Sequence, residues 1–266
     1  MPRPRSWYVA TVVLLALAPA AACSSHGDIT ANSTCGDYLS TQTDARHAAA
    51  TRISTELHAT GAGKPVWGTG LDAGCGAAPD TKLRAYFAAQ QAMKVPGESM
   101  RHTINVDDTA LVNTLAYAHG KPRRGEVVVF NAPSTWSADP TPARFIKRVI
   151  ATGGDHVVCC DAQHRLTVNG RPLDEPYLDR DEATEASPDK FDITVPDGRL
   201  WVMGDDRFHS GDSREQFLRM HDIAAATIPV NAMVGRVFAV IDGHNQDEIR
   251  PLTVPSSYAD VPDPQR

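Results

Sequence analysis

The stretch Phe145-Ile146-Lys147-Arg148-Val149-Ile150 predicts a β-strand, because branched and aromatic side chains make up most of it. Lys147 stands inside this apolar run, and we expect the strand to bury it. Burial penalises the charged ammonium group and so lowers its pKa. An amine that has lost its extra proton can accept one from a hydroxyl group. The stretch therefore predicts both a core strand and a candidate general base.

The matching candidate nucleophile, Ser99, lies far upstream. It belongs to Pro96-Gly97-Glu98-Ser99-Met100, where proline and glycine predict a turn that exposes the hydroxyl group. Ser99 and Lys147 are 48 positions apart (147 − 99), so only the fold can bring them together. Taken singly, a turn serine and a strand lysine that reaches to water are ordinary structural residues. Taken together, they predict a nucleophile and its base.

Short runs of β-branched and aromatic residues continue along the chain after residue 95. Turn signals such as Asn169-Gly170 and Asp197-Gly198 separate them, and no helical pattern comes between them. Many short strands without interleaved helices predict an antiparallel, mainly β domain. The predicted strands cover residues 109–113, 126–130, 145–151, 156–160, 166–168, 191–195, 200–203 and 234–241.

The chain before residue 95 has a helical period instead. Apolar residues at a spacing of mostly four predict a helix from 35 to about 57, namely Leu39, Ala45, Ala49, Ile53 and Leu57. Glycines predict a loop over 61–78, and a second helix is expected from 79 to about 92. Cys35 and Cys75 are the natural disulfide pair, and their bond would contribute about 3–4 kcal/mol. Residues 24–94 are thus predicted to form a small helical module.

Residues 1–23 have the pattern of a secretory leader. Arg3 and Arg5 precede an apolar run, which is too short for a comfortable membrane span, and small residues follow it. Ala20-Ala21-Ala22-Cys23 resembles a bacterial lipobox, with Ala20 in place of the usual leucine, so Cys23 is a candidate lipidation site. An uncleaved anchor and a released protein are the alternatives. In each case the body is exported, where disulfides are permitted.

Composition excludes some classes of function. The chain has 266 residues and a net charge of −6, and it contains no basic block of the kind that binds nucleic acid. Its ten histidines show no metal-ligand spacing, so no metal is expected, and no cofactor is needed. The adjacent Cys159 and Cys160 are either two strand residues on opposite faces or a redox pair.

A third segment, Gly204-Asp205-Asp206-Arg207-Phe208-His209-Ser210-Gly211-Asp212-Ser213-Arg214, completes a pattern. In chain order PGESMRHTI, KRVIATGGD and GDDRFHSGDSR resemble the conserved boxes of bacterial type I signal peptidases, which are Ser–Lys peptidases. RRGEVVVF and LTVNGRPLDEPYL resemble the connecting pieces of that family. The resemblance covers about residues 95–242 and implies an antiparallel β catalytic domain there. Residues 243–266, rich in proline, are predicted to be a flexible tail.

The resemblance also implies roles for single residues. Ser99 would be the nucleophile, with its backbone N–H as an oxyanion donor, and Lys147 would be the general base. Ser210 would orient the lysine amine, and Met100 would line the cleft. Ion pairs would support the site, through Asp212 with either Arg148 or Arg214.

The chain departs from the family pattern at a few positions. Gly97 stands where some members have a serine that supplies a second oxyanion donor. Asp206 replaces the usual asparagine and adds a negative charge near the site. His102 and Ile104 replace the usual proline and leucine.

The function implied by the resemblance is that of a membrane-associated serine endopeptidase acting on the extracytoplasmic face of the cell membrane. Its partners would be the membrane surface and preproteins with small residues one and three positions before the cut. Two alternatives remain open at this point. One alternative is a processing peptidase dedicated to few substrates, and the other is a catalytically silent lipoprotein with a binding or chaperone role in its helical module.

Overall fold

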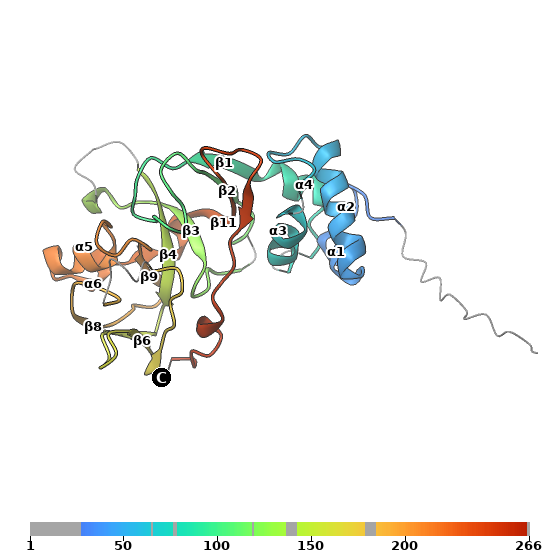
Figure 1. Ribbon diagram of the computed structural model, residues 1–266. Helices are drawn as coiled ribbons and strands as arrows, with labels where there is room; N and C mark the ends of the chain where they lie inside the picture. The colour runs from blue at the N-terminus through green and yellow to red at the C-terminus, as the bar shows by residue number, and fades with distance from the viewer. Residues whose placement is uncertain are drawn as a thin grey trace, which may run out of the picture.

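The computed structural model describes residues 28–64, 66–76, 79–118, 120–136, 143–178 and 185–264. Four helices gather next to β1, β2 and β11, and most of the remaining chain forms strands (Figure 1). The predicted leader, including Cys23, lies outside the described residues. Among the helices that are described, none has the length and hydrophobicity needed to cross a membrane.

The core of the molecule is a curved sheet of eight antiparallel strands. Seven of them follow the order β1-β2-β11-β3-β4-β9-β10, and β12 pairs with β11. This arrangement confirms the predicted mainly β, antiparallel fold. The strands are β1 (Gln90–Lys94), β2 (Thr109–Asn113), β3 (Val127–Asn131), β4 (Arg144–Thr152), β9 (Arg199–Met203), β10 (Ile228–Pro229), β11 (Met233–Ile241) and β12 (Ile249–Pro251).

A second, four-stranded sheet has the order β7-β6-β5-β8. Its strands are β5 (His156–Cys159), β6 (Leu166–Val168), β7 (Arg171–Pro172) and β8 (Phe191–Thr194). The predicted turn Asn169-Gly170 joins β6 to β7, with φ of 51° and 76°, respectively. Apolar side chains of this sheet pack against Trp201 and Met203 of β9, and this packing forms a core between the two sheets. A disulfide joins the adjacent Cys159 and Cys160 at the end of β5.

The helical module differs from the prediction in its elements. The expected first helix is two helices, α1 (Cys35–Ser40) and α2 (Thr43–Glu56), because Thr41 is extended and ends α1. The predicted loop over 61–78 is wrong, since it contains α3 (Val66–Cys75). The expected second helix is only α4 (Leu83–Ala88), after which the chain enters β1.

Glycines in α3 explain why a helix was not predicted there. A β-carbon on Gly70 would lie 2.7 Å from the Phe238 ring, and one on Gly74 would lie 2.0 Å from the Tyr86 hydroxyl. Glycine has a low helix propensity, so a segment rich in glycine is predicted to be a loop. The contacts that glycine permits with the two rings are visible only in the folded protein.

The helical module shares its core with the large sheet. Trp67 and Leu71 of α3 belong to the same buried cluster as Leu111 of β2 and Phe238 of β11. The rings of Trp67 and Phe238 are 5.4 Å apart. A disulfide between Cys35 and Cys75 fastens α1 to the end of α3. The module is therefore packed onto the sheet that contains Lys147.

The segment after Ile241 is packed on the domain, contrary to the predicted flexible tail. Residues 249–251 pair with β11, and a 3-10 turn follows at η3 (Ser256–Tyr258). Tyr258 and Val261 are buried in the cluster that contains Trp201. The prolines that suggested disorder exclude a helix, but they are compatible with edge strands and turns.

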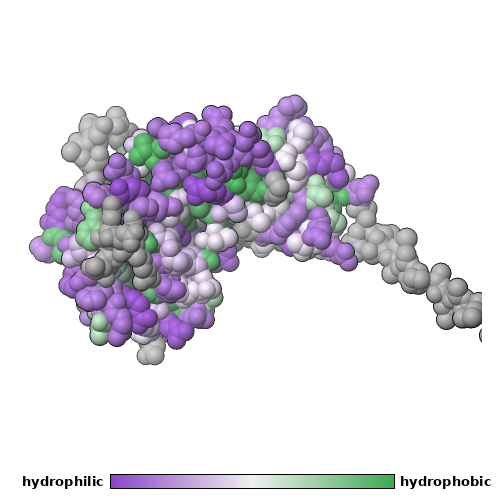
Figure 2. All heavy atoms as spheres, in the orientation of Figure 1, coloured by the Kyte–Doolittle hydropathy of each residue, from purple (hydrophilic) through white to green (hydrophobic). Residues whose placement is uncertain are grey.

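Two further helices and two 3-10 turns lie in loops of the β domain. They are α5 (Ser213–Met220), α6 (Ile223–Ala226), η1 (Ser134–Trp136) and η2 (Val230–Ala232). The face of the molecule in Figure 2 is largely hydrophilic, with hydrophobic side chains in scattered patches. The large apolar side chains that are exposed in the described part of the chain are Val106, Phe208, Leu218 and Val254.

Candidate active site

The fold brings Ser99 and Lys147 into contact. Nζ of Lys147 lies 2.6 Å from Oγ of Ser99 and donates a hydrogen bond to the Ile146 carbonyl oxygen at 3.1 Å. Lys147 is in the interior of β4, opposite Val128 of β3, and only 4% of its surface is exposed. The strand pattern alone predicted this burial.

Burial lowers the pKa of Lys147 from 10.5 to about 8. Removal of the ammonium group from water is the main cause, and the positive charge of Arg214 acts in the same direction. The carboxylates of Asp212 and Asp205 partly oppose the shift. A substantial fraction of the amine is therefore neutral near pH 8, where it can accept a proton from Ser99.

Hydrogen bonds fix the turn that carries Ser99. The Arg101 N–H donates to the Glu98 carbonyl oxygen at 2.7 Å, and the Ile104 N–H donates to that of Met100 at 2.7 Å. The Met100 side chain is buried with Ile104 in the core next to β1. From the third motif, the Asp206 N–H donates to the carbonyl oxygen of Ser99 at 3.2 Å. The first and third motifs are thus connected through the backbone of the proposed nucleophile.

Gly204 allows this close approach. A β-carbon at that position would lie 2.3 Å from the Ser99 carbonyl oxygen and 2.2 Å from Oγ of Ser210. Real β-carbons are not found at such distances, so any larger residue would move the serine turn. The glycine at the start of the third motif therefore has a steric role.

Ser210 lies beside Gly204, but its contact with the lysine differs from the expected one. Its Oγ is buried and forms no hydrogen bond with Lys147 in this structure. The expected role of Ser210 in orienting the lysine amine is therefore a proposal that rests on the family pattern.

Two buried ion pairs support the site. Arg148 forms two hydrogen bonds with Asp205, at 2.9 and 2.6 Å. Arg214 forms two with Asp212, at 3.0 and 2.8 Å. Of the two possible partners for Asp212, the structure thus selects Arg214. Arg148 of β4 binds Asp205 instead, and this pair holds the third motif (residues 204–214) next to β4.

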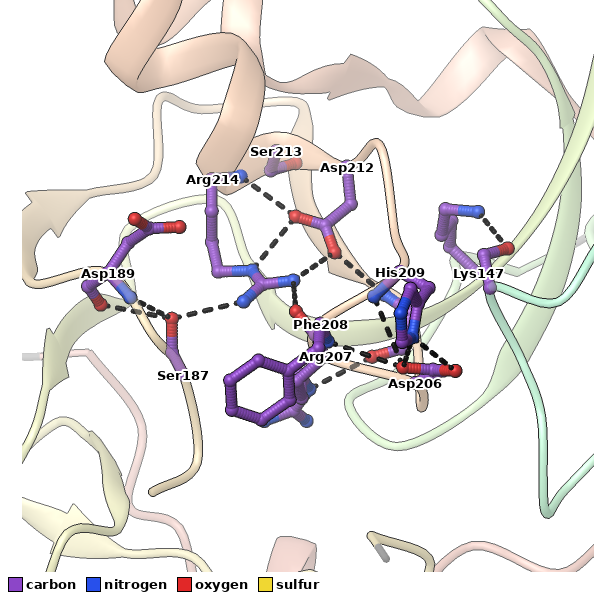
Figure 3. Close-up of polar contacts among 12 residues, drawn as sticks. Lys147, Ser187, Asp189, Asp206, Arg207, Phe208, His209, Asp212, Ser213 and Arg214 are labelled. Atoms are coloured by element: carbon purple, nitrogen blue, oxygen red, sulfur yellow. Dashed lines mark hydrogen bonds and ion pairs between the residues drawn. The ribbon is translucent and has the colours of Figure 1, made fainter. Parts of the chain in front are cut away.

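Asp212 connects the ion pair to the motif backbone (Figure 3). Burial alone would raise its pKa, but Arg214 and the Gly204 N–H outweigh burial, and the pKa falls below its ordinary value. The carboxylate also caps α5 by accepting a hydrogen bond from the Arg214 N–H. Arg214 in turn donates to the Ser187 hydroxyl and the Arg207 carbonyl oxygen.

A second group of buried side chains lies next to Arg148, and the sequence analysis did not identify it. Arg207 pairs with Glu175 at 2.6 Å, and the Tyr177 hydroxyl donates to the same carboxylate. The guanidinium of Arg148 stacks over the Tyr177 ring, 3.8 Å from its centre. Tyr258, near the end of the chain, hydrogen-bonds to Tyr177 at 2.7 Å. Glu175 and Arg207 lie in segments that resemble the family, but the sequence alone does not show that they pair. Tyr258 lies outside those segments, and no motif points to it.

Asp206 holds a smaller cluster at the edge of the site. Its carboxylate forms an ion pair with Arg101 at 3.0 Å and contacts Nδ1 of His209 at 3.1 Å. It also accepts hydrogen bonds from the backbone N–H groups of Phe208 and His209. The carboxylate that replaces the usual asparagine thus accepts hydrogen bonds from its own turn, and its ion pair with Arg101 connects that turn to the Ser99 loop.

A pocket of about 320 Å³ opens beside the dyad. Met93 of β1, Met100 and Ile146 form an apolar part of its wall. Ser99 and Lys147 also line the pocket. Gly97 also lines it, and a side chain there would meet open space. The pocket can therefore hold apolar side chains of an extended peptide next to the Ser99 hydroxyl group. Trp136 and Arg144, which the sequence analysis did not single out, line the pocket as well.

In the part of the chain that the structure describes, no three His, Cys, Asp or Glu side chains are arranged to hold a metal ion.

A buried Ser–Lys pair on an antiparallel β domain is the kind of site found in serine peptidases that lack a histidine base. The profile of the signal peptidase family, peptidase S26, matches residues 81–241, which is more than half of the chain. The chain belongs to this family.

The chain is also similar to curated proteins that are named signal peptidase I. Residues of this chain are 35% identical over 187 residues to signal peptidase I of Mycobacterium tuberculosis, covering 55% of this chain and 63% of that protein. They are 34% identical over 128 residues to signal peptidase I S of Bacillus subtilis, covering 45% and 64%. The chain thus spans less than two thirds of the length of these relatives. A solved signal peptidase I from Enterococcus faecalis is 25% identical, with a TM-score of 0.34, and the match covers 44% of this chain and 97% of that one.

Proposed function

We propose that this protein is a serine endopeptidase that cleaves signal peptides from exported preproteins, with Ser99 as nucleophile and Lys147 as general base. The observation that carries the proposal is the 2.6 Å contact between Ser99 Oγ and a buried lysine amine whose pKa is lowered to about 8. Membership of the signal peptidase family supports the same conclusion.

In the first half of the proposed reaction, the Ser99 oxygen attacks the carbonyl carbon of the scissile bond while Nζ of Lys147 takes the hydroxyl proton. The tetrahedral intermediate carries a negative oxygen, to which the Ser99 backbone N–H donates. The C–N bond then breaks, and the Lys147 ammonium gives its proton to the leaving amine. The products are an ester on Ser99 and the mature protein with a free amino group.

In the second half, water replaces the amine. Neutral Lys147 takes a proton from the water, whose oxygen attacks the ester carbon. The C–O bond to Ser99 breaks, and the lysine returns the proton to the serine oxygen. The signal peptide leaves with a new carboxylate, and both residues regain their starting protonation states. Burial near Ile146 and Val149 lowers the pKa of the amine, so that it gives up its proton readily and is a base again in the next cycle.

Substrates are proposed to bind as an extended strand beside β1 and β4, with small side chains one and three positions before the cut. The pocket lined by Met93, Met100 and Ile146 supports strand-like binding, because its apolar wall lies beside Ser99. The preference for small residues follows the family pattern. Preproteins held at the membrane surface are the proposed partners.

Membrane attachment is proposed through residues 1–23, with lipidation of Cys23 as the specific route. The lipobox-like Ala20-Ala21-Ala22-Cys23 supports it. Intact-mass analysis of the mature protein, purified from membranes, tests this part. A mass that includes a diacylglyceryl group on residue 23 is expected, and an unmodified amino terminus would contradict it.

Cleavage of precursors tests the central proposal. The purified full chain is incubated with a panel of preproteins, alongside Ser99→Ala and Lys147→Ala, and the products are identified by mass. Both substitutions are expected to abolish cleavage, because one removes the nucleophile and the other the base. Ser40→Ala and Lys190→Ala are matched controls at exposed positions away from the site and should cleave normally.

The same experiment separates the alternatives. A catalytically silent protein would cleave no precursor, and cleavage that survives both substitutions would remove the dyad from the mechanism. Cleavage of one or few members of the panel would identify a dedicated processing peptidase. The intact Ser99–Lys147 contact argues against a silent protein.

A further inference from the structure

The pocket beside Ser99 carries charge of one sign. Among the described residues that line it, Arg144 and Lys147 are the only ionisable side chains, and none is a carboxylate. Lys147 is buried against Ser99, whereas Arg144 is exposed at the first position of β4. The pocket therefore offers a permanently charged guanidinium to a ligand.

Arg144 forms no ion pair within the described part of the chain, unlike its neighbours. Arg148 binds Asp205, Arg101 binds Asp206 and Arg124 binds Asp155. The whole chain has an excess of acidic residues, with a net charge of −6. Since no described carboxylate pairs with Arg144, its guanidinium is available to a negative group of a ligand.

The position of Arg144 on β4 indicates which part of a substrate it meets. Side chains alternate along a strand, so Arg144 shares a face with Ile146, about 7 Å away. Ile146 packs with Val95 and Met100, which form the inner wall of the pocket. Arg144 is three residues before Lys147, about 10 Å along the strand. It therefore lies at the end of the pocket away from the Ser99–Lys147 contact.

We propose that Arg144 selects precursors with an acidic side chain four or five positions before the cut. The inference rests on the proposed function, in which small residues before the cut occupy the pocket that Ile146 lines. A peptide extended past those residues brings its preceding side chains to Arg144. A guanidinium binds a carboxylate through two parallel hydrogen bonds, which favours aspartate and glutamate over their amides. Such a requirement narrows the set of precursors that the enzyme processes.

Peptides with matched charges test this selection. The full chain is given peptides with alanine one and three positions before the cut and either Glu, Gln or Lys at the fourth or fifth position. The Glu peptide is expected to have a kcat/KM roughly five- to tenfold above that of the Gln peptide at one of these positions. The ratio should fall toward one as salt is raised, because ions screen the attraction.

Charge reversal makes the assignment specific. Arg144→Glu should reverse the preference, so that the Lys peptide is cleaved faster than the Glu peptide. Arg144→Gln, which retains a long side chain, should bring the Glu-to-Gln ratio close to one. Arg84→Glu is the control, since it makes the same change of charge at an exposed position of α4, outside the pocket lining. It should retain the wild-type ratio. Ratios within one variant are independent of how much of that variant is folded.

The outcomes separate this inference from the proposed function. Equal cleavage of Glu and Gln peptides by the wild type, or an unchanged ratio in Arg144→Glu, would overturn the role of Arg144 and leave the peptidase intact. Failure of the wild type to cleave any peptide or any preprotein would overturn the peptidase, and the role of Arg144 with it.

Discussion

At the scale of the residue, the pKa of Lys147 predicts the pH dependence of cleavage. Only the neutral amine can take the Ser99 proton, so kcat/KM should rise with pH and level off above a pKa of about 8. Below that pKa, activity should fall about tenfold for each pH unit. Rates measured from pH 6 to 9.5 check this. A profile that is flat across neutral pH would contradict a lysine base.

The same burial has a cost in stability. The folded protein lowers the pKa of Lys147 from 10.5 to about 8, so the buried charge destabilises the fold, in full below pH 8, where both states bind the proton. Lys147→Met should therefore remove activity yet raise the free energy of unfolding by up to about 3 kcal/mol at pH 7. The gain should shrink as pH rises from 8 toward 10.5, because the wild type regains stability there. Denaturant titrations at pH 7 and 10 measure it, and a destabilised variant at pH 7 would refute it.

At the scale of the element, the contact between the third motif and the serine turn depends on Gly204. Gly204→Ala should lower kcat/KM at least about a hundredfold, because the new β-carbon occupies the space of Ser210 and the Ser99 carbonyl. Gly76→Ala is the matched control, since a β-carbon there meets nothing within 4 Å. It should leave cleavage unchanged. Normal activity in Gly204→Ala would show that the close approach is not needed.

The strands were predicted better than the helical module, for a physical reason. Strands such as β4 and β9 are buried on both faces and consist of apolar runs, which the sequence displays directly. By contrast, β1 is an edge strand with exposed side chains, and it was predicted as the end of a helix. Helix α3 was predicted as a loop because it contains several glycines. Two of these glycines leave space for the side chains of Phe238 and Tyr86, where a β-carbon would clash. Tertiary contacts of this kind leave no local pattern.

The candidate site shows the same division. The motifs around Ser99, Lys147 and Ser210 are contiguous in sequence, so they could be found before the structure. The partner of Arg148 could not be found in this way, because Asp205 and Asp212 both lie in the third motif. Only the folded structure shows that Arg148 pairs with Asp205 and not with Asp212. The layer formed by Glu175 and Tyr258 comes from distant segments and needed the fold.

At the scale of the whole molecule, the disulfide between Cys35 and Cys75 joins α1 to α3, the helix that packs on the large sheet. A Cys35→Ala/Cys75→Ala double variant should lower the free energy of unfolding by about 3–4 kcal/mol, because 40 residues separate the bonded cysteines. Thermal unfolding of the variant measures the loss. Substitution is preferred to a reducing agent, which would also act on Cys159 and Cys160. An unchanged melting temperature would show that the helices hold without the bond.

The placement of Tyr258 has a consequence for the biogenesis of the protein. Its hydroxyl completes the hydrogen-bonded layer behind Arg148. In the chain, Tyr258 follows Ser99 by 159 positions (258 − 99) and Lys147 by 111 (258 − 147). A ribosome therefore adds both reactive residues long before it adds the tyrosine. A nascent chain that stops between Lys147 and Tyr258 holds the reactive pair without the layer that supports Arg148.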